Sequence, residues 1–210
     1  MKINEIFYSV QGESTLVGLP TIFVRTSGCH LRCHYCDTKY AYYEGRQMTV
    51  DEILRAIGAF PCRQVCLTGG EPLLQKESLL LLSRLCNENY RVSLETSGDI
   101  SCRQVDCRVR CIIDIKTPSS GELGRFNIEN LNRYENSEFK FVIGTEEDFY
   151  WSEQFVKQFC IAEKFTVLYS PSFEIMDPRW LAEKILKEKS PARLQLQLHK
   201  YIWSPSTRGV

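Results

Sequence analysis

The sequence predicts an α/β fold in which helices flank a mainly parallel sheet. Segments with the composition of β-strands alternate with segments of helical periodicity, an order that is typical of parallel sheets. Glycine and polar residues follow several of the strand-like segments, at the sheet edge where such folds bind ligands. The 210 residues, 43% of them hydrophobic and 25% charged, suffice for one domain with a substantial core. We therefore expect residues 1–210 to form a single domain.

Two strands and a helix are expected in the first part of the chain. Residues 3–10 and 21–26 are rich in β-branched and aromatic side chains, which favour strands. Residues 49–57 carry apolar side chains at helical spacing. Thr49, with Glu52 three residues later, has the pattern of a capping box at the start of this helix.

The alternation continues along the rest of the chain. Short apolar runs predict strands, longer periodic segments predict helices, and Pro178 suits the first turn of the last helix. The expected elements are a strand at 64–68, a helix at 76–87, strands at 91–96, 111–115 and 139–143, a helix at 149–163, a strand at 166–169, a helix at 178–189 and a strand at 194–198. Because parallel strands share one carboxyl edge, the polar clusters that follow them are expected to converge on one site.

The charge balance excludes several classes of partner. Lys and Arg total 26, as do Asp and Glu, so the formal net charge is zero. This argues against binding to a nucleic-acid backbone or an anionic membrane. No apolar stretch approaches the length that spans a bilayer, and the first residues do not resemble a secretory signal. We expect a cytoplasmic protein with a small-molecule partner, no nucleic acid and no membrane.

Ten cysteines are a high share for a chain of this length. Such a composition fits either a disulfide-bonded scaffold or a metal protein. Disulfide-bonded scaffolds are usually short and secreted, whereas this chain is long enough to bury a core without cross-links. Reduced, metal-binding cysteines are therefore the favoured interpretation.

Three cysteines form a C-x3-C-x2-C pattern, at Cys29, Cys33 and Cys36. Thiolates at this spacing on a loop can bind one soft metal centre. Three thiolates would leave one iron of a four-iron cluster without a protein ligand and open for chemistry. The loop is also compatible with a zinc site completed by His30 or His34, and with a chance clustering of buried thiols.

The cysteine pattern, together with Gly-Gly-Glu-Pro at residues 69–72 after an expected strand, resembles the radical S-adenosylmethionine superfamily. Further segments resemble one family within it, the 7-carboxy-7-deazaguanine synthases, nearly from end to end. These segments are residues 8–13 (YSVQGE), 36–38 (CDT), 94–98 (LETSG), 114–118 (DIKTP) and 197–200 (QLHK).

The resemblance implies a fold and a reaction. The fold would be a partial, open (β/α)6-type barrel of about six core strands, since full barrels are longer than this chain. The reaction would be a radical-mediated ring contraction of 6-carboxy-5,6,7,8-tetrahydropterin to 7-carboxy-7-deazaguanine, with loss of ammonia, on the way to 7-deazapurines such as queuosine. The cofactors would be a [4Fe-4S] cluster, S-adenosylmethionine and Mg²⁺. One electron from a reductant such as flavodoxin or ferredoxin would start the reaction, and the protein would be a homodimer.

The resemblance also assigns roles to residues. The metal ligands would be Cys29, Cys33 and Cys36 for the cluster and Thr38 for Mg²⁺. S-adenosylmethionine would contact residues at the ends of strands, namely Gly69, Gly70, Glu71, Thr96, Ser97 and Lys116. The pterin would contact Gln11, Glu13, Arg25 and His199, and residues 208–210 would fold over the site. Taken singly, several have simpler explanations: a glycine pair suits a tight turn, Lys116 a surface position and Arg25 an ordinary ion pair.

Other functions fit part of the pattern. An activating enzyme for a glycyl-radical protein would share the short chain and the cysteine loop, but not the matching segments at both ends. An electron carrier usually has four cysteine ligands, and a zinc-stapled module needs no Gly-Gly-Glu after a strand. Among the other cysteines, Cys66 and Cys111 are expected to be buried strand residues. A second metal site at Cys102, Cys107 and Cys111 is the less favoured interpretation.

Overall fold

The computed structural model, which describes residues 1–210, contains one nine-stranded sheet. Its strand order is β3-β1-β2-β4-β5-β6-β7-β8-β9. The six longer parallel strands are β2 (Pro20–Thr26), β4 (Gln64–Gly69), β5 (Arg91–Thr96), β6 (Arg110–Ile115), β7 (Glu138–Ile143) and β8 (Thr166–Pro171). Antiparallel β1 (Lys2–Val10) and β3 (Arg46–Gln47) extend one edge, and β9 (Arg193–Leu194) extends the other. Because the two edge strands do not pair with each other, the barrel is partial and open, as predicted.

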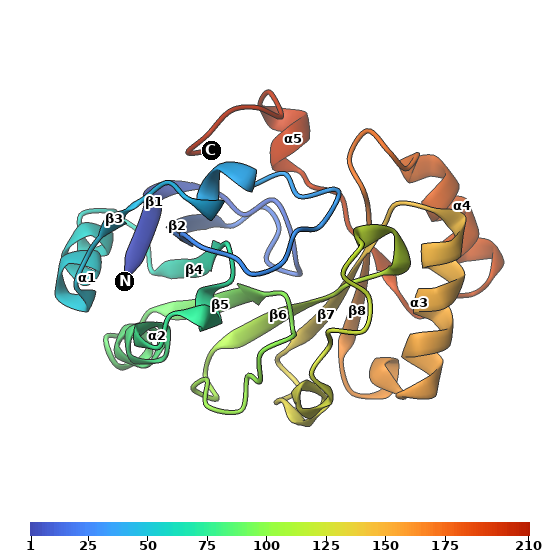
Figure 1. Ribbon diagram of the computed structural model, residues 1–210, viewed down its shortest axis with the longest axis horizontal. Coiled ribbons are helices and arrows are strands. Elements are labelled where there is room, and N and C mark those ends of the chain that lie inside the picture. The colour runs from blue at the N-terminus through green and yellow to red at the C-terminus, as the bar shows by residue number, and fades with distance from the viewer.

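Four helices lie along the outer side of the curved sheet (Figure 1). They are α1 (Val50–Gly58), α2 (Glu77–Asn87), α3 (Glu146–Gln158) and α4 (Pro178–Lys187). Their buried faces, such as Ile53 and Ile57 of α1 and Leu81 of α2, pack into one hydrophobic core with the strands. The short helix α5 (His199–Ile202) lies instead on the inner side, beside the loop that follows β2 (Figure 1). None of these helices is both long and apolar enough to cross a bilayer.

Short 3-10 segments replace full helices in several connections. They are Lys39–Tyr42, Pro72–Leu74, Pro118–Ser120, Ile128–Asn132 and Ile161–Glu163. No α-helix stands between β5 and β6 or between β6 and β7. The barrel is therefore reduced in helices as well as open.

The predicted cap of the first helix is present, but the predicted bounds of the third helix are wrong. Thr49 accepts a hydrogen bond from the Glu52 amide, and the Glu52 carboxylate accepts one from the Thr49 amide. Helix α3 was expected at 149–163 but begins at Glu146, because Thr145 and Asp148 form a second capping box. It ends early because Cys160 adopts a left-handed conformation (φ 50°), which cannot continue a helix.

The last predicted strand, at 194–198, is also wrong beyond Leu194. Gln195 turns its side chain inward, where its Oε1 accepts from the Ser14 amide at 2.6 Å and its Nε2 donates to Glu13 at 3.1 Å. The Leu198 amide donates to the Gly12 carbonyl at 2.9 Å. The Gln195 amide still donates to the Tyr169 carbonyl of β8 at 2.9 Å, and beyond it these contacts turn the chain toward the loop that follows β1.

Candidate active site

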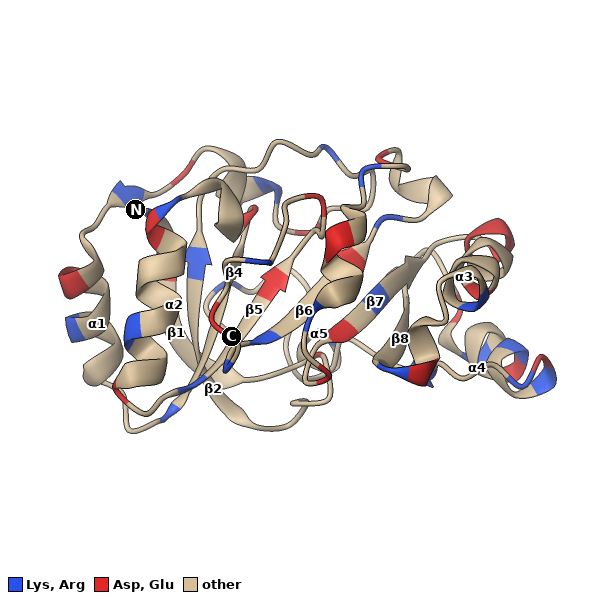
Figure 2. Ribbon diagram, turned by 90° about the horizontal axis from the view of Figure 1, so that it is seen from below, with Lys and Arg blue, Asp and Glu red and all other residues tan.

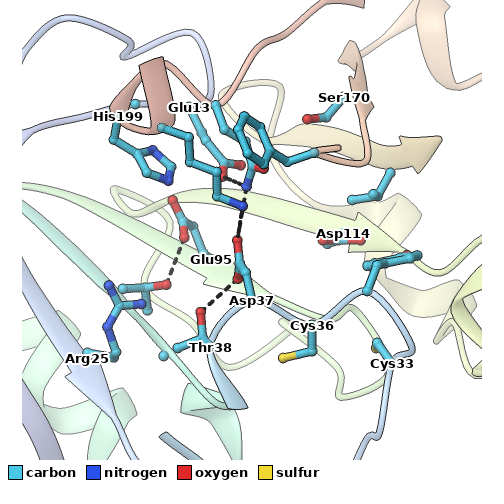
Figure 3. A pocket seen from close by; sticks show the side chains of 18 of the residues that line it. Glu13, Arg25, Cys33, Cys36, Asp37, Thr38, Glu95, Asp114, Ser170 and His199 are labelled. Carbon is cyan, nitrogen blue, oxygen red and sulfur yellow. Dashed lines mark hydrogen bonds and ion pairs between the residues drawn. The ribbon is translucent and has the colours of Figure 1, made fainter. Parts of the chain in front are cut away.

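A cavity of about 640 Å³ lies on the inner side of the sheet, at the carboxyl ends of the parallel strands. Its walls come from the loops that follow β1, β2, β4 and β5, from strands β6 and β7, and from the segment after β8. Helix α5 and residues 205–210 cover it. Figure 3 shows side chains from these distant segments pointing toward one another. The expected convergence of the polar clusters is therefore present.

All three motif cysteines line this cavity as free, partly buried thiols. Burial raises the pKa of Cys29, and it raises the pKa of Cys33 to about 11; the neighbouring thiols act in the same direction. A metal centre binds thiolates, so its binding would displace these protons. The cavity thus brings together the three cysteines that the spacing predicts.

The arrangement fits a cluster better than a single ion. No group of three His, Cys, Asp or Glu side chains is gathered tightly enough to hold one metal ion. In a cubane each thiolate binds a different iron, so the ligands are spread, whereas zinc needs every donor on one centre. Both histidines of the loop are engaged elsewhere: His30 pairs with Asp99, and the His34 Nδ1 lies 3.2 Å from the Ser119 carbonyl. Three thiols facing a cavity fit a [4Fe-4S] cluster with one open iron.

The glycine pair after β4 lets two loops meet. A Cβ at position 70 would lie 2.0 Å from the Gly28 carbonyl oxygen, directly before the first cysteine. Gly69 has φ +122°, and a Cβ there would lie 2.4 Å from the Thr26 nitrogen. The Gly28 carbonyl also accepts from the Glu71 amide at 2.9 Å. The pair therefore lets the loop after β4 support the cysteine loop, while both glycines line the cavity.

Glu71 lies beneath the cavity and organises two hydroxyls. Its carboxylate is fully buried. It accepts hydrogen bonds from Thr96 Oγ1 at 2.9 Å, from the Ser97 amide at 2.7 Å and from the Leu73 amide at 3.0 Å. Thr96 and Ser97 line the cavity, but Glu71 does not. A direct contact between Glu71 and a cofactor stays a prediction. The hydrogen bonds by which Glu71 orients the hydroxyls of Thr96 and Ser97 are present in the structure.

The residues predicted for substrate recognition gather on the side of the cavity away from Cys33 (Figure 3). The Glu13 carboxylate accepts from Lys140, Gln195 and Gln197. Although burial acts to raise it, the Lys140 ammonium holds the pKa of Glu13 at about 2. His199 fits against Gly12, where a Cβ would lie 2.1 Å from the His199 Nδ1.

The neighbours of Arg25 orient its guanidinium group, and the two terminal nitrogens remain available to bind a ligand. Its Nε donates to Glu5 at 2.7 Å, and its guanidinium lies 5.6 Å from the centre of the Phe7 ring. Its terminal nitrogens make no hydrogen bond within the protein. Gln11 is buried and donates to Glu95 at 3.4 Å. The ion pair with Glu5 is thus present, and Arg25 also lines the cavity with its terminal nitrogens unpaired.

Oxygen ligands for a hard cation stand next to the last cysteine. Thr38 Oγ1 donates to Asp37 at 2.9 Å, and both residues line the cavity. Asp37 is exposed, and the Lys200 ammonium at 2.6 Å holds the pKa of its carboxyl well below the usual range. An anionic carboxylate and a hydroxyl suit Mg²⁺, which prefers oxygen donors.

Several cavity residues were not predicted individually, namely Glu95, Asp114, Lys140 and Gln197. Lys116, by contrast, was predicted, and it is no surface lysine: its side chain is 13% exposed, and its Nζ lies 3.1 Å from Asp114. A signal for two of the missed residues was available, because Asp114 and Lys140 stand between apolar residues of β6 and β7. Figure 2 shows these acidic and basic positions within the strands.

Among the remaining cysteines, only the thiols of Cys102 and Cys111 lie close enough to share a hydrogen bond. Cys66 and Cys111 are fully buried, as expected for strand residues, and Cys102 is buried too. Cys107 is exposed, so it does not share their surroundings. No group of three His, Cys, Asp or Glu side chains that could hold a metal ion is found here.

Comparisons with known proteins agree with this geometry. The Radical SAM superfamily model matches residues 23–105. The 7-carboxy-7-deazaguanine synthase of Chlorobaculum tepidum is 47% identical, over 100% of this chain and 97% of that protein. The enzyme of the same name from Koribacter versatilis is 41% identical over the full length of both. The crystal structure of QueE from Escherichia coli is similar in fold, with a TM-score of 0.80 at 24% identity over 94% of each chain. The chain is 41–47% identical to these two relatives over its full length, and its cavity is lined by the three motif cysteines. The chain therefore belongs to the 7-carboxy-7-deazaguanine synthase family of radical S-adenosylmethionine proteins.

Proposed function

We propose that this protein is a radical S-adenosylmethionine lyase that converts 6-carboxy-5,6,7,8-tetrahydropterin to 7-carboxy-7-deazaguanine, with loss of ammonia, in queuosine biosynthesis. The relatives that carry this name support the proposal. The observation that carries it is a single cavity in which three thiols face a buried carboxylate, a guanidinium and an imidazole. A radical source and a polar recognition surface thus share one chamber.

The cysteine side of the cavity would hold the cluster and S-adenosylmethionine. Cys29, Cys33 and Cys36 would hold the [4Fe-4S] cluster, whose open iron supplies, with S-adenosylmethionine, the radical that abstracts hydrogen from the pterin. Gly69 and Gly70 offer backbone without side chains, Thr96 and Ser97 offer hydroxyls held by Glu71, and Lys116 offers a cation. Together they can bind the ammonium, hydroxyl and carboxylate groups of an amino-acid nucleoside.

The substrate half is assigned by charge and hydrogen-bonding capacity. Glu13, ionised across the physiological range, can accept hydrogen bonds from the amino and ring N–H groups of an aminopyrimidinone. Arg25 can pair its free terminal nitrogens with the pterin carboxylate in two-point fashion. His199 and Gln11 complete the surface that surrounds the substrate. Residues 205–210 lie over it.

Mg²⁺, the reductant and the dimer belong to the same proposal. Thr38 would bind Mg²⁺ next to the substrate carboxylate, with Asp37 beside it. A flavodoxin or ferredoxin would deliver the electron, and two chains would form a homodimer. All ten cysteines are free thiols in the structure, which supports a site of action in the reducing cytoplasm.

The test is a turnover assay with purified protein. Reconstituted, reduced protein with S-adenosylmethionine, Mg²⁺ and 6-carboxytetrahydropterin should yield 7-carboxy-7-deazaguanine. Protein that releases 5′-deoxyadenosine but leaves the pterin unchanged would retain the superfamily assignment and refute the proposed substrate.

A further inference from the structure

Four largely buried side chains of alternating charge form a row along the cavity, namely Glu13, Lys140, Asp114 and Lys116. Lys140 Nζ lies 2.5 Å from Glu13 Oε2 and 3.7 Å from Asp114 Oδ2. The second oxygen of Asp114 lies 3.1 Å from Lys116 Nζ. Each of the four side chains is less than 20% exposed, and all four line the cavity. The row connects the cysteine side of the cavity to the side where the pterin is proposed to bind.

Lys140 is the one cation that pairs with Glu13. The other two donors to this carboxylate are neutral amides, with Gln197 Nε2 at 2.8 Å and Gln195 Nε2 at 3.1 Å. The charged and titratable groups facing Glu13 are Lys140 from β7, His199 from α5 and Glu95 from β5.

Glu13 and Glu95 form an asymmetric pair. Burial raises the pKa of Glu95, and the Glu13 charge acts in the same direction. Two buried carboxylates that face each other without a cation tend to share a proton. The Lys140 ammonium contacts Glu13 at 2.5 Å, whereas the hydrogen-bond donors to Glu95 are the neutral side chains of Thr68 and Gln11, so Lys140 favours the charge on Glu13.

We propose that Lys140 is a positioning residue that keeps Glu13 anionic and fixed against Gln195 and Gln197, so that Glu13 presents only hydrogen-bond acceptors to the substrate. This inference rests on the proposed function, since it takes the N–H groups of the pterin ring as the donors that Glu13 meets. A protonated Glu13 would place an O–H donor against those N–H groups and lose one of its acceptors. Lys140 would thus set the substrate preference without touching the reacting atoms.

The test compares Lys140→Met with Lys140→Arg, and with Lys187→Met as a matched control on an exposed position of α4. Losing one partner of a buried charge pair should raise the KM for the pterin about 30-fold or more in Lys140→Met, with iron content retained. Lys140→Arg should restore much of the affinity, and Lys187→Met should match the wild type. In Lys140→Met the pKa of Glu13 rises, so kcat/KM should also fall as the pH is lowered, in a range where the wild type is flat.

A double variant keeps the test decisive if Lys140→Met folds poorly. Glu13→Gln combined with Lys140→Met removes both charges, so its KM should be no worse than that of Glu13→Gln alone. Additive losses, or a wild-type KM and pH profile in Lys140→Met, would overturn the inference. The wild-type assay separates this result from the parent proposal: no product from the wild type refutes the function, whereas product from the wild type and Lys140→Met alike refutes only the role of Lys140.

Discussion

Cys33 illustrates how position separates the three motif thiols from the other seven cysteines. Only Cys29, Cys33 and Cys36 line the large cavity. Replacing Cys33 with Ala should abolish iron binding and product formation together, because two thiolates cannot hold the cluster stably. Iron analysis after anaerobic reconstitution should give about four irons for the wild type. Cys160→Ala, at an exposed position outside this cavity, should retain them; a Cys33→Ala variant with full iron would contradict the assignment.

Glu71 supports the fold and the proposed cofactor site through the same hydrogen bonds. Its buried carboxylate accepts hydrogen bonds from three residues, and an amide in its place would set an N–H group against one of these donors. Glu71→Gln should lower the free energy of unfolding by about 1–3 kcal/mol. It should also weaken S-adenosylmethionine binding, because Thr96 and Ser97 lose their orientation. Urea unfolding and ligand titration measure the two effects, and Glu163→Gln, at an exposed position, should change neither.

Site residues could be predicted from the sequence only where they form part of a short local motif. Three cysteines within eight positions, or a glycine pair after a strand, are visible in the sequence itself. The contact between Glu13 and Lys140 joins residues 127 positions apart, and no local pattern indicates it. What a single sequence does show is that a lysine interrupts an apolar strand, which marks Lys140 as unusual without naming its partner.

Among the elements, the helix caps were the most readable features. The Thr49 box of α1 was predicted and is present. The Thr145–Asp148 box of α3 was equally readable, and using it would have given the correct start at Glu146. The strand predicted at 194–198 failed for a different reason, because the side chain of Gln195 is drawn to Ser14 by a tertiary contact that outweighs strand propensity.

The capping box of α1 has a measurable consequence. Thr49→Ala removes the hydroxyl that accepts from the Glu52 amide, and this should lower the free energy of unfolding by about 1 kcal/mol. Thr49→Ser keeps the hydroxyl and should remain close to the wild type. Equal urea midpoints for the two variants would show that the cap does not stabilise the fold.

For the whole molecule, the end of the chain secures the cavity by contacts with early segments. Lys200 of α5 pairs with Asp37 at 2.6 Å, and Arg208 pairs with Glu44 at 2.9 Å while lying 3.9 Å from the centre of the Tyr40 ring. Figure 1 shows α5 and the C-terminus beside the loop that follows β2. All nine strands belong to one sheet, and we propose that residues 1–210 unfold as one unit.

The ion pairs of Glu13 with Lys140 and of Asp37 with Lys200 predict how the stability of the molecule responds to acid. The pKa of Glu13 is about 2, below its ordinary value of 4.5, and the pKa of Asp37 is lowered too. Each carboxylate therefore contributes stability that is fully present above its ordinary pKa and is lost as the pH falls below it. The free energy of unfolding should decrease as the pH is lowered from about 4.5 to 2, in the window that the Glu13 shift defines. Lys200→Met removes the partner of Asp37, so the free energy of unfolding of this variant should decrease less with falling pH than that of the wild type. Equal pH dependence in the two proteins would show that the pair of Asp37 and Lys200 makes no contribution.

The most direct measurement follows a deuterium label on C6 of 6-carboxytetrahydropterin during turnover. We predict that deuterium moves to the 5′ carbon of the adenosyl group recovered from the reaction, while 7-carboxy-7-deazaguanine is formed. This outcome requires the cysteine-held cofactor half of the cavity and the Glu13 half to act on one substrate. Product formed with no label in the adenosyl group, or a pterin left intact beside unlabelled 5′-deoxyadenosine, would contradict it.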